Sequence, residues 1–137
     1  MSDTLVDSNV LLDVFTEDPR WFAWSEAALE RCAEEGALVI NPVIYAEISI
    51  GFEQIEDLER ALPAGLLQRQ PLTAEAAFLA GKAFLAYRRQ GGGGRSPLPD
   101  FFIGAHAAVA GLRLLTRDAK RYRTYFPGLE IIEPARA

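Results

Sequence analysis

The stretch TLVDSNVLLD, residues 4–13, joins a strand-like run to a helix-like one. Apolar and β-branched side chains fill residues 4–6, and the acidic turn DSN follows them. Over residues 10–15 the apolar side chains recur with helical spacing. A strand that leads directly into a helix is the first half of a βαβ unit, so this stretch predicts a parallel sheet.

The rest of the chain repeats this alternation. Apolar runs predict four more strands, at residues 38–40, 66–68, 112–115 and 129–132. Helical periodicity predicts helices at residues 21–34, 43–51, 53–61, 74–89, 101–110 and 119–125. Helix-end signals agree with this, namely Thr73 as an N-cap, Pro42 and Pro99 in first turns and Gly111 at a C-terminal end. We therefore expect an α/β fold with three layers, α/β/α, around a central, mostly parallel sheet of about five strands.

Length and composition fit a single domain spanning residues 1–137, with 50% hydrophobic and 24% charged residues. One cysteine and one histidine exclude an internal disulfide, a zinc finger and an iron–sulfur site, so any metal must bind through oxygen. The start MSDTLVDS does not resemble a signal peptide, and the run ALVINPVIYA is too short and polar to span a bilayer. We expect a cytoplasmic protein that does not enter a membrane.

Charge is distributed unevenly along the chain. The first 81 residues hold 15 of the 19 acidic side chains and only 4 of the 14 basic ones, whereas the net charge of the whole is −5. Two interpretations stay open: separate solvated faces of opposite sign, or a functional polarity.

Four carboxylates are predicted to meet at one edge of the sheet. In right-handed βαβ units, the carboxyl end of a strand and the amino end of the next helix lie on the same edge. The acids at these places are Asp7, Glu47, Asp100 and Asp118. Clustered carboxylates raise one another's pKa unless a cation neutralises them. Mg²⁺ or Mn²⁺ suits an oxygen-only site and favours phosphate as a further partner, which points to phosphoryl chemistry.

Each acid also has a structural interpretation. Asp7 and Asp118 fit helix caps, Asp100 complements a helix dipole, and Glu47 fits the surface of an amphipathic helix. The metal-site hypothesis therefore rests on their convergence.

The four segments that carry these acids resemble the PIN domain, and in particular the ribonuclease toxins of VapC-type toxin–antitoxin pairs. The similarity covers nearly the whole chain and is carried by the order and spacing of VDSNVLLD, NPVIYAEIS, PDFFIGAHA and LLTRD. The resemblance implies a site in which Asp7, Glu47, Asp100 and Asp118 hold Mg²⁺ or Mn²⁺, with Asn9 and Thr116 as polar supports. It further implies metal-dependent endonucleolytic cleavage of RNA and inhibition by a small cognate antitoxin. We expect a homodimer or a toxin–antitoxin hetero-oligomer. The tetraglycine run at 91–94 departs from the family pattern.

An acidic site needs basic side chains nearby if it is to hold RNA. Basic residues flank the glycine run and follow the strand at 112–115; the candidates for the RNA backbone are Arg88, Arg89, Arg95, Arg117 and Lys120, with Arg121 and Arg123 beside them. A solvated charged helix and loop is the alternative interpretation of these residues.

Other classes of protein are less compatible with the sequence. An aspartyl phosphatase requires a second acid two residues after Asp7, and that position holds Asn9. A phospho-receiver domain requires an acidic pair and a well-placed lysine. The strongest alternative is a PIN-like module that binds RNA or an antitoxin without cleaving. The aromatic stretch 21–24 fits either the core or an interface, and His106 and Cys32 fit packed positions.

Overall fold

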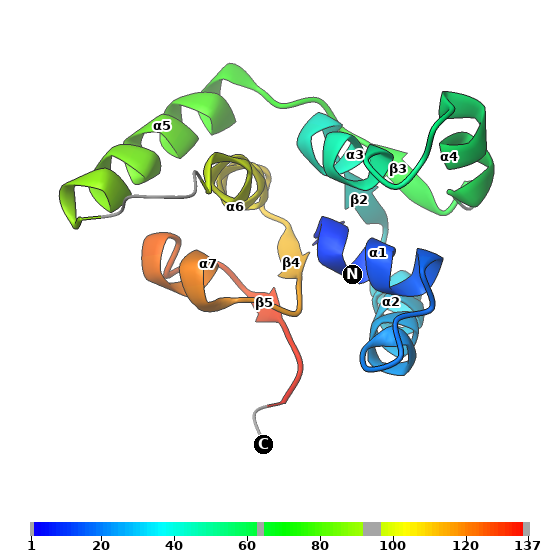
Figure 1. The fold of residues 1–137 in the computed structure, drawn as a ribbon. Coiled ribbons are helices and arrows are strands. Elements are labelled where there is room, and N and C mark those ends of the chain that lie inside the picture. Colours follow the sequence, from blue (N-terminus) through cyan, green and yellow to red (C-terminus); the bar gives the residue numbers. More distant parts are fainter. Residues whose placement is uncertain (1, 63–64, 92–96, 136–137) are drawn as a thin grey trace.

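A five-stranded sheet forms the centre of the molecule (Figure 1). The computed structural model describes residues 2–62, 65–91 and 97–135. The strands are β1 (Thr4–Val6), β2 (Leu38–Ile40), β3 (Leu67–Arg69), β4 (Arg113–Leu115) and β5 (Ile131–Ile132). Their order is β3-β2-β1-β4-β5, and every neighbouring pair is parallel. The expected sheet is confirmed, and it is parallel throughout rather than mostly so.

Seven helices connect the strands within the described residues: α1 (Ser8–Phe15), α2 (Phe22–Glu35), α3 (Pro42–Ser49), α4 (Ile55–Ala61), α5 (Ala74–Arg89), α6 (Leu98–Ala110) and α7 (Lys120–Tyr125). In Figure 1, α1 and α2 lie on one side of the sheet, and α5, α6 and α7 lie on the other. This is the expected α/β/α arrangement. None of the helices in this described part is long and apolar enough to cross a membrane.

Burial in the core stabilises the short central strands. Every residue of β1 and β2 is buried, because both strands lie inside the sheet and helices cover their two faces. The outer strands β3 and β5 are only partly buried or exposed. Within the aromatic stretch, Trp24 packs against the core. Trp21 lies edge-to-face against Trp24, with 6.4 Å between the two ring centroids.

Local signals set the helix ends. The Oγ1 atom of Thr73 accepts a hydrogen bond from the Ala76 amide and caps α5, and Gly111 ends α6 in the left-handed conformation at φ 68°. Pro42 opens α3, and Pro99 lies in the first turn of α6, as the sequence predicted. The tetraglycine run lies almost wholly outside the described residues.

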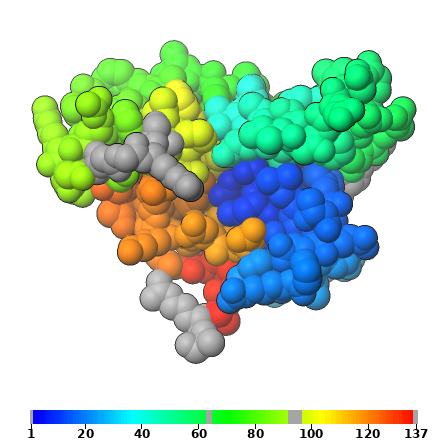
Figure 2. Space-filling model, viewed as in Figure 1, coloured from blue at the N-terminus to red at the C-terminus, as the bar shows by residue number. Residues whose placement is uncertain are grey.

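The strand order decides where the functional side chains lie. β1 is the middle strand, with β2 on one side and β4 on the other. The turns that follow these three strands therefore open on one edge of the sheet. Figure 2 shows the outcome on the surface: the N-terminal segment, in dark blue, touches the orange segment that follows β4.

Candidate metal centre

Asp7 lies at the centre of this edge. It follows β1 and caps α1, and its Oδ1 atom accepts a hydrogen bond of 2.8 Å from the Ser8 amide. Its Oδ2 atom accepts two more, from the Thr116 hydroxyl at 2.8 Å and from the Tyr122 hydroxyl at 3.0 Å. Only 4% of the residue is exposed. Asp7 is thus both the predicted helix cap and a carboxylate fixed in one orientation.

The environment of Asp7 disfavours its charge. Burial raises the pKa of Asp7 to about 6, and the charges of Asp100 and Glu47 add to this rise. The hydrogen bonds from Thr116 and Tyr122 act in the opposite direction but do not cancel it. A buried carboxylate with two acidic neighbours is an arrangement that a divalent cation stabilises.

Glu47 reaches the same place from α3. The Ser8 hydroxyl donates a hydrogen bond of 2.9 Å to Glu47 Oε1. The side chain is half-buried, and burial raises its pKa, while the bond from Ser8 lowers it and the charge of Asp100 raises it. Of the two interpretations offered by the sequence, the structure therefore favours the inward one over a plain surface residue.

A buried polar network holds the amino end of α3. Asn41 caps the helix through Oδ1, which accepts from the Ile44 amide at 2.9 Å. Its Nδ2 group therefore faces the His106 Nδ1 atom, also at 2.9 Å, and His106 Nε2 faces Gln70 Oε1 at 3.0 Å. This assigns the ring proton to Nε2. His106 is buried, as expected, and burial lowers its pKa.

Asp100 extends from the first turn of α6. Arg121 Nη1 lies 2.6 Å from Asp100 Oδ2 and forms an ion pair with it. The Tyr122 hydroxyl lies 3.4 Å from Asp100 Oδ1, so this one tyrosine contacts both Asp7 and Asp100. The structure thus brings together three of the four predicted acids, Asp7, Glu47 and Asp100.

Asp118 occupies a more exposed position. It follows β4, and its amide donates to Thr116 Oγ1 at 3.2 Å. It shares with Asp100 a cleft of about 410 Å³, whose lining is completed by Lys120, Arg121, Thr124 and Tyr125. Asp118 is not among the charges that raise the pKa of Asp7. Asp118 is exposed and lines the same cleft as Asp100.

The two predicted polar supports contact each other. Asn9 Nδ2 donates to Thr116 Oγ1 at 3.2 Å, and Asn9 Oδ1 accepts a longer bond, 3.4 Å, from the Arg117 amide. Thr116 in turn donates to Asp7. The two side chains link α1 to the turn after β4, which is a supporting position for the carboxylates.

The predicted RNA-binding cations lie in different surroundings. Lys120 lines the cleft beside Asp100 and Asp118, and Arg88 and Arg89 are exposed at the end of α5. Arg117 instead forms a two-pronged ion pair with Asp13, at 2.8 and 3.0 Å, and lies over the ring of Trp21. Arg95 lies outside the described residues.

Sequence reasoning missed four contributors: Ser8 as a partner of Glu47, Tyr122, Arg121 as the partner of Asp100, and Asp13. A signal existed for Tyr122. It is the buried residue of α7, whose run KRYRTY holds the aromatic side chains Tyr122 and Tyr125 at i and i+3, a spacing that places both on one face of the helix. For Asp13, which is 2% exposed, the sequence offered no such sign.

The donor set suits a hard divalent cation because it consists of carboxylate, hydroxyl and amide oxygens. In the part of the chain that the structure describes, no three acidic, histidine or cysteine side chains already form a coordinating group. Arg121 neutralises part of the charge on Asp100. The chemistry of the donors and the raised pKa of Asp7 are therefore the observations that fit a metal ion.

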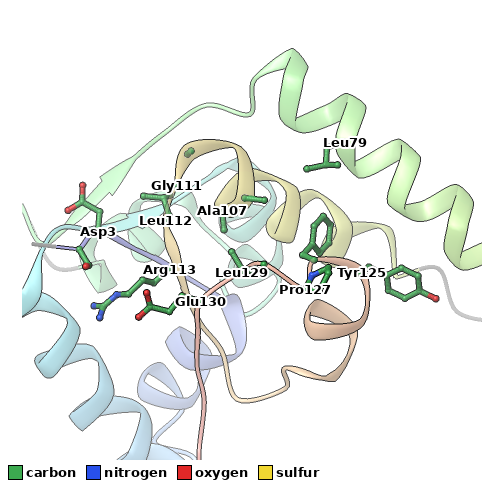
Figure 3. A pocket seen from close by; sticks show the side chains of 15 residues that line it. Asp3, Leu79, Ala107, Gly111, Leu112, Arg113, Tyr125, Pro127, Leu129 and Glu130 are labelled. Atoms are coloured by element: carbon green, nitrogen blue, oxygen red, sulfur yellow. The ribbon is translucent and has the colours of Figure 1, made fainter.

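A separate pocket of about 740 Å³ lies elsewhere (Figure 3). Its lining includes Asp3, Gly111, Leu112 and Arg113, which precede or begin β1 and β4, and Glu130. It therefore opens at the amino edge of the sheet, opposite the carboxylates. Size does not make it the candidate site, because the grouped acids lie at the other edge.

The fold and the site together define a class of α/β domain in which strand ends bring separated acids together. The chain belongs to the PIN domain family: the family model matches residues 4–127. No curated protein sequence matches the chain.

Several solved structures share the fold. One is VapBC2 from Rickettsia felis bound to a DNA fragment from the promoter, which is 18% identical with a TM-score of 0.75 and covers 97% of this chain and 99% of that one. A toxin–antitoxin complex from Klebsiella pneumoniae is 23% identical with a TM-score of 0.70, covering 98% and 99%. DNA-bound VapBC from Salmonella typhimurium is 20% identical with a TM-score of 0.70, covering 97% and 98%. At these identities the likeness establishes the fold.

Proposed function

We propose that this protein is a Mg²⁺- or Mn²⁺-dependent endoribonuclease and the toxin of a toxin–antitoxin pair. One observation carries the proposal: burial raises the pKa of the Asp7 carboxyl to about 6, and Glu47 and Asp100 lie close enough for their charges to add to this rise. Such a cluster is electrostatically unfavourable without a cation. Membership of the PIN family and the fold shared with toxin–antitoxin complexes support the same assignment.

In this proposal, Asp7, Glu47, Asp100 and Asp118 hold the metal. A divalent ion bound there would supply Lewis acidity, which would favour attack of water on a phosphodiester and stabilise the leaving oxygen. The chain itself supplies orientation. Thr116 and Tyr122 fix Asp7, Ser8 fixes Glu47, and Asn9 ties the turn that carries Asp118 to α1.

The cleft beside Asp100 and Asp118 is the proposed position of the RNA backbone. Lys120 and Arg121 line it. Positively charged side chains next to an acidic centre hold phosphates that the acids alone would repel. Arg88 and Arg89 extend this proposal to the end of α5, and Arg117 contributes least because Asp13 already pairs with it.

The direct test incubates the purified protein with total RNA, with and without Mg²⁺ or Mn²⁺, beside an Asp7→Asn variant whose fold is checked by circular dichroism. We expect discrete, metal-dependent cuts with the wild type only. Cuts that survive chelation, or that the variant also makes, would contradict the proposal. RNA binding without any cleavage would instead identify a non-catalytic PIN-like module.

The toxin assignment has its own test. We expect induced expression of the wild-type chain in a bacterial host to arrest growth, and expression of Asp7→Asn to leave growth intact. Co-expression of a small antitoxin partner should restore growth and yield a co-purifying complex. Normal growth on expression of a wild-type protein that cleaves RNA in vitro would refute the toxin role while leaving the nuclease assignment intact.

A further inference from the structure

Helix α7 places two consecutive side chains on the two oxygens of one carboxylate. Arg121 Nη1 lies 2.6 Å from Asp100 Oδ2, and the Tyr122 hydroxyl lies 3.4 Å from Asp100 Oδ1. Tyr122 also donates to Asp7 Oδ2 at 3.0 Å. A divalent cation held by Asp7 and Asp100 would therefore share the Asp100 carboxylate with Arg121 and Tyr122 of α7.

The two side chains of α7 differ in how firmly they are held. Tyr122 is 1% exposed and packs in the core, so its hydroxyl is a fixed support. The Arg121 side chain is 39% exposed and lines the open cleft. Its guanidinium carbon lies 5.7 Å from the centre of the Tyr87 ring, which keeps the cation near the cleft. Arg121 can leave Asp100 without disturbing the core, whereas Tyr122 cannot.

We propose that Arg121 is a displaceable counter-ion: it competes with a divalent cation for Asp100, and after displacement its guanidinium binds an RNA phosphate in the same cleft. This inference rests on the proposed function and adds a role for a residue of this chain. The ion pair joins two partly exposed groups, so it is weak. Its competition lowers the affinity of the site for a divalent cation by a factor of about two to five. A guanidinium matches phosphate with two parallel hydrogen bonds, which provides the second binding state.

Lys120 is the matched control. It precedes Arg121 on the same helix, carries the same charge and lines the same cleft. Replacing either residue by Gln removes one positive charge from the neighbourhood of the site, so a general charge effect acts in both variants. Only the change at Arg121 removes a direct partner of Asp100.

The first measurement is Mn²⁺ binding to the full chain by isothermal titration calorimetry. We expect Arg121→Gln to bind Mn²⁺ about two- to five-fold more tightly than the wild type, and Lys120→Gln to differ by less than two-fold. Arg121→Lys, which keeps the charge, should stay near the wild type. Equal Mn²⁺ affinities in Arg121→Gln and Lys120→Gln would overturn the competition.

The second measurement is the salt dependence of binding to a short single-stranded RNA by fluorescence anisotropy, with and without Ca²⁺, with gel electrophoresis showing that the RNA stays intact. Each phosphate contact contributes about 0.7 to the slope of log affinity against log salt concentration. When Ca²⁺ is added, the salt slope of the wild type should become steeper by about 0.7 relative to that of Arg121→Gln. Lys120→Gln should show a reduced slope in both conditions.

The outcomes separate the two hypotheses. If the wild type binds no Mn²⁺, the metal-dependent function fails and this inference fails with it. If Mn²⁺ binds and the wild type and Arg121→Gln respond identically to Ca²⁺ in the RNA assay, only the role of Arg121 is refuted. Tighter Mn²⁺ binding together with loss of the Ca²⁺-dependent slope in Arg121→Gln would establish it.

Discussion

A single hydroxyl, that of Thr116, organises the carboxylate site. It donates to Asp7 Oδ2 and accepts from Asn9 Nδ2 and from the Asp118 amide. A hydroxyl offers one donor and two acceptor positions, so Thr116 uses its full capacity. It thereby fixes the position of Asp7 relative to the turn that carries Asp118.

Replacing Thr116 by Val keeps the shape of the side chain and removes these three bonds. We expect the free energy of unfolding to fall by about 1–3 kcal/mol and Mn²⁺ affinity to fall by about 10- to 100-fold. Thr4→Val is the control, because Thr4 is also buried in the same strand pair but bonds Arg113 at the opposite edge. It should lower stability and leave Mn²⁺ affinity unchanged. Equal losses of affinity in both variants would show that Thr116 acts through stability alone.

The raised pKa of Asp7 makes metal-free stability depend on pH. Its pKa is about 6 in the folded chain and near 3.8 when unfolded, so the folded state binds more protons between these values. Stability therefore falls as pH rises through this window. Relative to Asp7→Asn, which cannot ionise, the wild type should lose up to about 3 kcal/mol between pH 4 and pH 7. Urea unfolding of both proteins in a chelating buffer measures this difference, and parallel curves would contradict it.

Some of the site was predictable from the sequence and some was not. The proximity of Asp7, Glu47 and Asp100 was predictable because each lies at a fixed place after a strand or in the first turns of a helix, and the parallel topology brings these places together. The partners of these acids were not predictable. Tyr122 is 115 positions from Asp7 and Arg121 is 21 positions from Asp100, and their contacts depend on how α7 is oriented against the sheet.

At the scale of elements, α6 carries Asp100 and its packing depends on one glycine. A Cβ atom at Gly104 would lie 2.5 Å from the ring of Phe126. The absence of a side chain lets α6 approach the segment after α7, and this approach brings Asp100 near Arg121 and Tyr122. Gly81 on α5 offers a contrast, because a Cβ atom there would meet no atom within 4 Å.

We expect Gly104→Ala to destabilise the protein by about 1–3 kcal/mol, because Phe126 or the helix must shift. Gly81→Ala should instead stabilise it by about 0.5–1 kcal/mol, since alanine is the better helix former in an exposed helix interior. Thermal or urea unfolding measures both. A further variant, Gly104→Ala with Phe126→Leu, should recover part of the loss. A neutral Gly104→Ala would show that this contact is not tight in solution.

Helix α1 is tied to the turn after β4 by Asp13. This buried carboxylate binds the Arg117 guanidinium and accepts a bond of 2.7 Å from the Ser25 hydroxyl on α2. The contact gives Arg117, which the sequence offered as a phosphate ligand, a structural role. It also shows a limit of charge patterns, which reveal that a residue is basic but not whether an acid from another element already pairs with it.

Element positions followed closely from the sequence. The predictions for β1, β2 and α5 agree with the structure at both ends, since alternation of apolar runs and the cap at Thr73 mark them clearly. The edges of the sheet were less exact: β3 is Leu67–Arg69 and β5 only Ile131–Ile132. Edge strands bury less, so the apolar pattern that marks a strand is weaker there.

At the scale of the whole molecule, the uneven charge distribution has a partly structural explanation. Acids of the first half pair with bases of the second, as in Glu35 with Arg113 and Asp13 with Arg117. The cleft beside Asp100 and Asp118 is lined by Lys120 and Arg121, the bases that the proposed function assigns to the RNA backbone. The sequence left two interpretations of the uneven charge, solvated faces and functional polarity. Ion pairing between the two halves of the chain is a third.

Cation binding should be visible in the stability of the entire chain. A ligand that binds only the folded state at ten times its Kd stabilises by about 1.4 kcal/mol, or roughly 5 °C in Tm for a chain of this length. We expect Mg²⁺ to raise the Tm of the wild type at pH 7.5 and to leave Asp7→Asn unchanged, measured by differential scanning calorimetry. The same Tm shift in both proteins would indicate that Mg²⁺ acts elsewhere.

The central position of β1 has a consequence for the order in which the contacts of the carboxylate site form during synthesis. The strand is synthesised before its permanent neighbour β4 and before Tyr122, which bonds Asp7 and lies 115 positions after it. Long separation along the chain delays such contacts until β4 and α7 have been synthesised. A nascent chain that has not yet reached α7 therefore carries Asp7 and Glu47 without Tyr122, and the arrangement of the carboxylates is complete only after α7 has been synthesised.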